Sequence, residues 1–440
     1  MEILEKTRKM LGKHPLCDCC LGRQFALLGY GLDDQKRGET LKLLLTMKAH
    51  REALLGKKTG VTLLKTLAAN GACSMAAEIL RKIKKRVGDK RECYLCEGRF
   101  DLLEDLVKRS VKKLKHYEYN TFLVGMKLPT EIEEREDEFK AEFDVNHGES
   151  MKNEFSRDIG KRLSEITKKQ TEYKRPEIVI HINPFTRETK IQPNPLYIAG
   201  RYRKLARGIP QSKWFCSNCR GEGCPKCDWT GKKYQESIEE IIANPALKAT
   251  EGDDVSLHAA GREDIDVRML GEGRPFILEV KRPVKRFGDL ETLAETINEK
   301  AKEKLEVVNL HFADKDAVRS LKKKETAEKV YKVTIRFDRN VSNEELSRVK
   351  ETLTNATIHQ QTPLRVLHRR ANRVREKHIY KAEIKRLAPD SAEMRIQCQG
   401  GLYIKELITG DEGRTKPCVA EVVNAKAEPF DLDVLDIINR

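Results

Sequence analysis

The stretch GREDIDVRMLGEGRPF, residues Gly261 to Phe276, sets three carboxylates, Glu263, Asp264 and Asp266, close to arginines. Two glycines and a proline follow, so we expect a tight turn that returns in the strand RPFILEV and leaves the acids at a sheet edge. Nearby arginines favour an ionised carboxylate, which makes Asp264 a candidate nucleophile or base. For an arbitrary cluster of this kind, a salt-bridged aspartate in an exposed loop is the commoner outcome.

Composition indicates a polyanionic partner. The chain has 440 residues, with 85 lysines and arginines against 69 aspartates and glutamates and a net charge of +16. A basic excess of this size is typical of proteins that bind nucleic acid. The alternative is solvation of a heat-tolerant protein, because 35% of the residues are charged. The length predicts about two to three domains.

We expect a soluble, cytoplasmic protein without a membrane partner. No apolar run approaches the roughly 18 residues that span a bilayer, and residues 1–14 lack the apolar segment of a signal peptide. In a reducing compartment, the 12 cysteines are expected to bind metal or fill the core rather than form disulfides.

Hydrophobic periodicity predicts an α+β chain in two parts. Apolar residues recur at three- and four-residue spacing through the first hundred residues, which indicates helices, and another helix is expected over 149–169. The segments EIVIHI and TKIQ follow as two strands around a turn. From residue 193 onward, strands such as KVYKVTIRF and EMRIQCQG alternate with helices, which is typical of a mixed, mostly antiparallel sheet with flanking helices. We place an accessory domain at 1–192 and a second domain at 193–440.

One cysteine set lies in the helical region. Cys17-x-x-Cys20 and Cys93-x-x-Cys96 together supply the four thiolates of a tetrahedral zinc site, which would clamp this region into one unit. Unrelated free thiols are the alternative. Four further cysteines are expected to act as small apolar residues: Cys19, Cys73, Cys398 and Cys418.

A second cysteine set forms an insert at 216–227 in the second domain. Cys216, Cys219, Cys224 and Cys227 lie within twelve residues, with glycines and a proline between them, which is the spacing of a compact zinc hairpin. Each set supplies four protein ligands, so no coordination position stays open for chemistry. Both sites are therefore predicted to be structural.

Two basic runs could contact phosphates. YIAGRYRKLARG, residues 197–208, interleaves tyrosines that can stack on bases with cations that can bind phosphates. RVLHRRANRVREKHIYK, residues 365–381, is the second run. An element with one charged, solvated face would show the same pattern. Together with the net charge, the runs favour RNA or DNA as the partner.

Four stretches resemble one enzyme family. AGREDIDVRMLGEGRPF is similar to the catalytic motif of the Pus-ten-type tRNA pseudouridine synthases, and its GRED resembles the G-R-x-D motif of other pseudouridine synthases. NPLYIAGRYRKLARGIPQSKW resembles the start of that catalytic domain, EKVYKVTI its second motif and GGLYIKELITGDEGRTKPC its third. The N-terminal cysteine pairs and EIVIHINPFTRETKI are similar to the family's zinc-containing, THUMP-type accessory region. The resemblance covers nearly the whole chain, and the compact second cysteine set fits archaeal members.

The resemblance implies that Asp264, the aspartate of GRED, is the nucleophile. Asp266 matches no functional position and is expected to be structural. Lys405 stands where many pseudouridine synthases have an arginine paired with the catalytic aspartate.

Three further residues are implied to bind the substrate. Tyr331 would stack on the target uracil and assist proton transfer, Tyr403 would line the pocket, and Arg262 would handle the flipped nucleotide. The partner implied is tRNA, with the uridines at positions 54 and 55 of the T-arm loop as targets. We expect a monomer and no cofactor for catalysis, since GEGRPF lacks the third glycine and the helix of a dinucleotide site.

Two other functions fit part of the sequence. A methyltransferase or thiolation enzyme joined to a THUMP-like domain needs a glycine-rich cofactor turn or a pyrophosphate loop, and neither is evident. A non-catalytic zinc-containing RNA-binding protein would explain the charge and the cysteines. It would leave the GRED, Tyr331 and Tyr403/Lys405 motifs unexplained.

Overall fold

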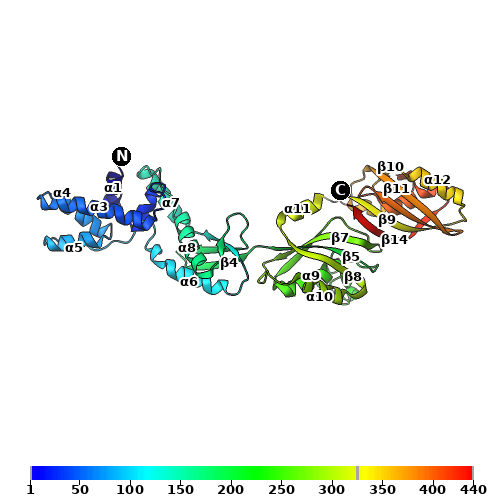
Figure 1. Cartoon of the computed structure of the whole chain (residues 1–440), viewed down its shortest axis with the longest axis horizontal. Helices are drawn as coiled ribbons and strands as arrows, with labels where there is room; N and C mark the ends of the chain where they lie inside the picture. Colours follow the sequence, from blue (N-terminus) through cyan, green and yellow to red (C-terminus); the bar gives the residue numbers. More distant parts are fainter. Residues whose placement is uncertain (1, 324–326, 439–440) are drawn as a thin grey trace. The chain divides into compact units, whose positions relative to one another are not determined.

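The computed structural model describes residues 2–323 and 327–438 (Figure 1). Its internal contacts divide the chain into two units, Met1–Asn194 and Pro195–Arg440. Each unit has hydrophobic clusters of its own, so each is described by itself. None of the helices in the described residues combines the length and the apolar composition that crossing a bilayer requires.

The first unit begins with helices that pack through leucines and glycines. They are α1 (Ile3–Lys13), α2 (Asp18–Gly22), α3 (Asp34–Leu54), α4 (Lys58–Ala69) and α5 (Ser74–Lys82). The leucines at three- and four-residue spacing on α4 are buried, as the periodicity predicts. Glycines allow α2 and α3 to touch, because a Cβ atom on Gly38 would stand only 2.1 Å from the carbonyl oxygen of Asp18.

The rest of the first unit combines helices with a four-stranded sheet of order β2-β1-β3-β4. The helices are α6 (Leu103–Leu114), α7 (Thr130–Glu142) and α8 (Met151–Thr167). The strands are β1 (Thr121–Met126), β2 (Gln170–Thr171), β3 (Ile178–Asn183) and β4 (Glu188–Pro193). β1 runs parallel to β2 and β3, while β3 and β4 form the predicted antiparallel hairpin. Alternate isoleucines of β3 are buried, as a strand with one core-facing side requires.

The second unit is built on one large mixed sheet of order β13-β10-β11-β12-β9-β14-β7-β5-β8, with β6 paired beside this path to β7 (Figure 1). Every pairing described in it is antiparallel except that of β14 with β7. The mixed, mostly antiparallel sheet of the prediction is thereby confirmed.

The elements of this unit follow in chain order. The first half holds β5 (Leu196–Lys204), α9 (Ile238–Thr250), β6 (Asp254–Ala259), β7 (Arg268–Lys281), α10 (Leu290–Ala301), β8 (Leu305–Ala313) and α11 (Lys315–Lys323). The second half holds β9 (Glu328–Phe337), α12 (Asn343–Leu353), β10 (Ala356–Gln361), β11 (Val374–Ala388), β12 (Ser391–Cys398), α13 (Ile404–Thr409), β13 (Thr415–Lys416), α14 (Val419–Val423) and β14 (Ala427–Ile438).

A short parallel contact joins the two halves of the sheet. β7 pairs with β14 at Arg268 and Met269 and with β5 further along, and two left-handed glycines make the change of partner possible. A Cβ atom on Gly271 would stand 1.8 Å from a carbonyl oxygen of β14, and one on Gly273 would stand 2.7 Å from a carbonyl oxygen of β5. GEGRPF is therefore a bulge inside a central strand. The expected tight turn and sheet-edge position are wrong.

The first basic run is mainly an inner strand. Residues 197–204 belong to β5, which lies between β7 and β8. Tyr202 and Lys204 are buried there, and Arg207, just after the strand, donates to the carboxylate of Asp433 at 2.7 Å. The interpretation of this run as an RNA-contacting surface is wrong for Tyr202 and Lys204, because both side chains are buried in the core.

Gly38→Ala is expected to destabilise the first unit by roughly 1–3 kcal/mol, because the added methyl group would push α2 away from α3. Gly12→Ala is the control: Gly12 is exposed on α1 with nothing within 4 Å of its Cβ position, so alanine should stabilise that helix by up to about 1 kcal/mol. Hydrogen–deuterium exchange of residues 2–194 in denaturant measures both effects. Equal exchange in the two variants would contradict the close α2–α3 contact.

Candidate active site

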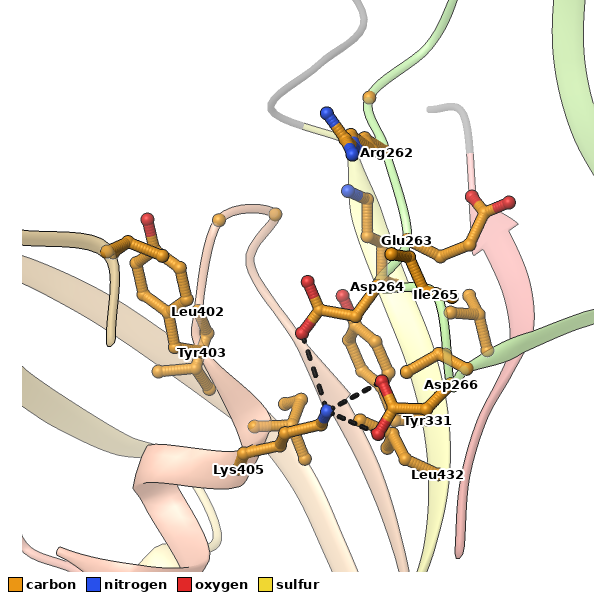
Figure 2. Close-up of a pocket in the computed structure, with 18 of the residues that line it drawn as sticks. Arg262, Glu263, Asp264, Ile265, Asp266, Tyr331, Leu402, Tyr403, Lys405 and Leu432 are labelled. Atoms are coloured by element: carbon orange, nitrogen blue, oxygen red, sulfur yellow. Dashed lines mark hydrogen bonds and ion pairs between the residues drawn. The ribbon is translucent and has the colours of Figure 1, made fainter. Parts of the chain in front are cut away.

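A cavity of about 830 Å³ opens in the second unit, where β7 and β14 join the two halves of the sheet. Its lining comes from the loop between β6 and β7, from β9 and β14, and from the segments around β10, β11 and α13. The structure places all five residues that were predicted to act on the substrate around this one cavity (Figure 2): Arg262, Asp264, Tyr331, Tyr403 and Lys405.

A buried ion pair anchors the loop that carries Asp264. The side chains of Glu263 and Arg274 are each 1% exposed, and Arg274 Nε donates to Glu263 Oε2 at 2.7 Å. The Tyr202 hydroxyl donates to the same carboxylate at 2.9 Å, and Arg274 Nη1 donates to the carbonyl oxygen of Ala260 at 2.6 Å. Burial and the charge of Glu263 raise the pKa of Tyr202, which keeps its hydroxyl protonated as a donor.

Two further side chains bind the backbone of this loop. Lys204 Nζ donates to the carbonyl oxygens of Asp264 at 3.2 Å and Ile265 at 2.6 Å. Gln211 Nε2 donates to the carbonyl oxygen of Gly261 at 3.0 Å. Burial lowers the pKa of Lys204 to about 8. Together with the hydrogen bond from Arg274 to the carbonyl oxygen of Ala260, these contacts hold the loop backbone on both sides of Asp264.

Two cations from the second half of the sheet reach the Asp264 carboxylate. Arg365 Nη1 lies 3.1 Å and Lys405 Nζ 3.6 Å from the same oxygen, Oδ2. The Asp264 side chain remains 39% exposed, so its carboxylate is oriented by charge yet accessible to a molecule in the cavity.

Lys405 makes its shorter contacts with Asp266. Its ammonium donates to the two carboxylate oxygens of Asp266 at 2.8 and 2.7 Å, and Figure 2 shows both acids directed toward it. Burial acts to raise the pKa of Asp266, but the hydrogen bond and the charge of Lys405, with smaller contributions from the backbone and from Lys204, together outweigh it, and the pKa is lowered. Lys405 is therefore shared between the two acids, whereas the family pattern pairs one cation with one aspartate.

Arg365 is a site residue that the motif analysis did not single out. It lies in the 3-10 turn Leu364–Arg369, and its Nε donates to Glu406 Oε1 at 2.6 Å. Glu406 is buried, and within the described residues its other oxygen has no hydrogen-bond partner. The guanidinium of Arg365 also lies 5.8 Å from the centre of the Tyr403 ring. The sequence offered one signal for Arg365 as a site residue: it is the first arginine of the second basic run.

Tyr331 enters the cavity from β9, where it is paired with Ile396 on one side and Val434 on the other. Burial raises the pKa of Tyr331, so its phenol stays neutral at physiological pH. Its hydroxyl has no hydrogen-bond partner in the part of the chain that the structure describes. The hydroxyl is thus available to a bound molecule.

Tyr403 and Arg262 occupy other parts of the wall. The backbone N–H of Tyr403 donates to Gln360 Oε1 at 2.8 Å, and its hydroxyl accepts from Arg370 Nη1 at 2.9 Å. Tyr403 is therefore held both at its backbone and at the end of its side chain. Arg262 is exposed, and its guanidinium lies 5.4 Å from the ring centre of Trp214. In Figure 2 it stands away from the Lys405 ammonium.

The first predicted cysteine set converges in the structure. The sulfur atoms of Cys17, Cys20, Cys93 and Cys96 all lie within 4.8 Å of one another, and those of Cys17 and Cys96 are 3.6 Å apart. All four are free thiols. A tetrahedral zinc ion with Zn–S distances of about 2.3 Å would place its sulfurs about 3.8 Å apart. The set therefore fits one such ion.

The second set fits equally well. Sulfur–sulfur distances are 3.9 Å for Cys216 and Cys224, 3.8 Å for Cys219 and Cys227, and 3.7 Å for Cys224 and Cys227. Backbone N–H groups of Cys219 and Asn218 lower the pKa of the Cys216 thiol. That shift favours the thiolate, which is the metal-binding form.

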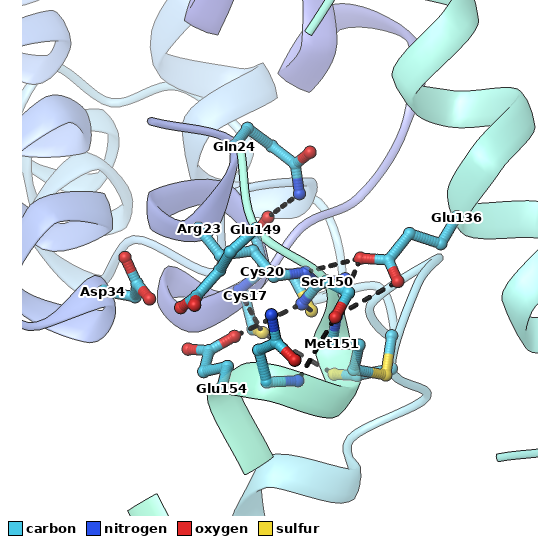
Figure 3. Close-up of polar contacts among 12 residues, drawn as sticks. Cys17, Cys20, Arg23, Gln24, Asp34, Glu136, Glu149, Ser150, Met151 and Glu154 are labelled. Carbon is cyan, nitrogen blue, oxygen red and sulfur yellow. Dashed lines mark hydrogen bonds and ion pairs between the residues drawn. The ribbon is translucent and has the colours of Figure 1, made fainter. Parts of the chain in front are cut away.

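A buried arginine links the first cysteine set to α7 and α8 (Figure 3). Arg23 is fully buried, and its guanidinium donates to Cys20 Sγ at 2.8 Å and to Glu136 Oε1 at 3.0 Å. The Glu136 carboxylate accepts the N–H of Met151 at 3.0 Å, at the start of α8, and Glu154 lies 3.5 Å from Arg23. A thiolate at Cys20 suits this pairing because the buried cation needs anionic partners.

Two family models match the chain. The model described as Pus10, C-terminal, matches residues 197–438, and the model described as Pus10 THUMP domain, archaeal, matches residues 106–183.

Proteins named tRNA pseudouridine synthase Pus10 are similar over nearly the whole chain. The one from Methanothrix thermoacetophila is 40% identical over 439 residues, which cover 99% of this chain and 94% of the relative. That from Methanocaldococcus jannaschii is 44% identical over 446 residues, with the same shares. That from Pyrococcus furiosus is 36% identical over 438 residues, which cover 99% and 98%.

These matches confirm the family resemblance and the fold class inferred from the sequence: a helical start that carries a cysteine set, a THUMP domain and a pseudouridine synthase domain. The chain belongs to the Pus10 family of tRNA pseudouridine synthases.

Proposed function

We propose that this enzyme isomerises uridines 54 and 55 in the T-arm loop of tRNA, with Asp264 as the nucleophile. The observation that carries the proposal is the Asp264 carboxylate, which is held by Arg365 and Lys405 yet accessible in the cavity that Tyr331 also lines. The net charge of +16 supports a polyanionic substrate.

The target uridine must leave its loop to reach Asp264, because a stacked base shields the atoms that react. Stacking of the flipped uracil on Tyr331 would offset part of the unstacking cost. Asp264 then attacks the nucleoside at the base or the sugar, or acts as a base at the sugar. The bond between C1′ and N1 breaks, the uracil rotates, and C1′ bonds to C5. By the end of the reaction the bond between Asp264 and the nucleoside has broken, or the proton that Asp264 took from the sugar has been returned, so the carboxylate is regenerated. The C5 proton is lost to solvent, and N1 ends protonated.

The cations have separate roles in this proposal. Arg365, fixed by the buried Glu406, orients the Asp264 carboxylate. Lys405 bridges Asp264 and Asp266 and thereby sets the spacing of the two acids. The neutral phenol of Tyr331 can relay a proton through its hydroxyl but carries no charge of its own at physiological pH. Tyr403 and Arg262 would contact the flipped nucleotide and its neighbours.

We also propose that both cysteine sets hold zinc as a structural ion. Each set provides four sulfur ligands at distances that suit a tetrahedral ion, which leaves no position for a substrate. At the insert 216–227, bound zinc would supply cross-links that a hydrophobic core does not, because this segment buries little besides its cysteines.

Asp264→Asn is expected to abolish tritium release from tRNA labelled at C5 of uridine, with a loss of at least about 1,000-fold, because the amide is a poor nucleophile. Asp266→Asn should keep the rate within roughly 10-fold, since Asp266 reaches Asp264 only through Lys405. Binding of tRNA by both variants is the control. Release by Asp264→Asn at the intact rate would move the nucleophile elsewhere.

Glu263→Gln is expected to lower kcat at least about 10-fold and to destabilise the second unit by roughly 3–5 kcal/mol, because it leaves the buried Arg274 without a counter-charge. The matched control is Glu272→Gln, an exposed residue of β7, the strand that carries Arg274, which should change neither quantity. Denaturant unfolding and saturating tritium-release rates measure the two effects. Full activity of Glu263→Gln would show that the ion pair does not hold the loop.

The purified chain is expected to retain two zinc ions after dialysis, as counted by plasma mass spectrometry. The double variant Cys216→Ser/Cys219→Ser should retain one ion, because two ligands are too few for tight binding. Cys73→Ser, which alters a half-buried cysteine outside both sets, should keep two. Two ions in the double variant would rule out the insert as a zinc site.

A further inference from the structure

The insert that contains the second cysteine set displays aromatic rings instead of burying them. Trp229 is 73% exposed and Phe215 57% exposed, although both are large apolar side chains. The buried residues at the centre of this module, residues 213–234, are cysteines. The aromatic rings are therefore not needed for its core, and two large exposed rings on so short a segment suit a binding surface.

The backbone holds Trp229 outward at a conformational cost. Trp229 has φ of +60° and Asp228 has φ of +49°, a left-handed conformation that bulky residues rarely adopt. Trp229 N–H donates to the carbonyl oxygen of Cys224 at 3.0 Å, and a Cβ atom on Gly223 would stand 2.9 Å from the Trp229 carbonyl oxygen. Strain that the surrounding structure maintains is characteristic of functional positions.

Cations accompany these rings. The Lys213 ammonium lies 4.9 Å from the centre of the Phe215 ring. Exposed Arg220 and Lys226 lie on the same short module, and the module contains five lysines and arginines against two carboxylates. Rings that stack on bases, together with cations that bind phosphates, are the combination that single-stranded nucleic acid requires.

The module joins the rim of the catalytic cavity. Trp214, two residues before Cys216, lines the cavity. The guanidinium of Arg262 lies 5.4 Å from the centre of the Trp214 ring. The two ends of the module pair with each other: Phe215 bridges to Lys232, and Lys233 N–H donates to the Trp214 carbonyl oxygen at 2.9 Å. A nucleotide next to one bound in the cavity would therefore meet this module.

We propose that the module is a second RNA-binding surface, on which Trp229 stacks against an unpaired base that flanks the target uridine. The inference rests on the proposed RNA substrate. It assigns the second cysteine set a purpose beyond stability: the set holds a strained turn that presents the ring. The surface binds substrate and takes no part in the bond-making steps.

Trp229→Ala in the zinc-loaded full chain is expected to weaken tRNA binding about 5- to 100-fold, the range of one base–aromatic stack. Trp229→Phe should restore binding to within roughly 3-fold, because the smaller ring still stacks. Single-turnover tritium release at saturating tRNA should stay near the intact rate in both. The control Phe430→Ala removes an exposed ring, under the guanidinium of Arg336, that neither lines the cavity nor belongs to the module.

A fluorescence measurement tests the contact even if Trp229→Ala loses its zinc. The chain has two tryptophans, so Trp214→Phe leaves Trp229 as the sole reporter. Its emission should be quenched by saturating tRNA, after correction with the Trp214→Phe/Trp229→Phe protein. Unquenched emission, or an unchanged Kd of Trp229→Ala while the intact protein releases tritium, would overturn the inference and assign the rings to another partner. Absence of release by the intact protein would instead refute the proposed function.

Discussion

The buried ion pair between Glu263 and Arg274 is the constraint on which the catalytic half of the molecule depends. Two opposite charges are stable away from water only when their remaining hydrogen bonds are also completed. The Tyr202 hydroxyl and the carbonyl oxygen of Ala260 complete them here. The pair thereby ties the loop between β6 and β7 to two central strands. Glu263 of the motif therefore anchors the loop, and the neighbouring Asp264 faces the cavity.

The site forms where the two halves of the sheet meet. The loop belongs to the half that contains β5 and β7, whereas Arg365, Lys405 and Tyr331 come from the half that contains β9 to β13. The short parallel contact of β7 with β14 brings the loop close to these residues, so that Arg365 lies within hydrogen-bonding distance of Asp264. The left-handed Gly271 permits that contact, because a side chain there would collide with β14.

Much of the candidate site could be predicted from the sequence, since its residues lie in short motifs. Three features could not. The glycines of GEGRPF are typical of both turns and bulges, and only the partner strands distinguish the two. Arg365 lay within a basic run whose members are alike in sequence, and its contact with Asp264 depends on where the chain folds back. The alternation in residues 197–204 likewise could not show whether cations face solvent or the core.

The sequence by itself determined the helical start, the strand pattern of the second unit, the two cysteine sets and the family motifs, because periodicity and ligand spacing act over a few residues. Tertiary structure alone decided which cation meets which acid. Lys405 bonds chiefly to Asp266, Arg365 reaches Asp264, and Arg274 is used to bury Glu263. Most of these pairs join residues about a hundred or more positions apart. Their distances follow from packing and charge burial across the whole sheet, which no local pattern encodes.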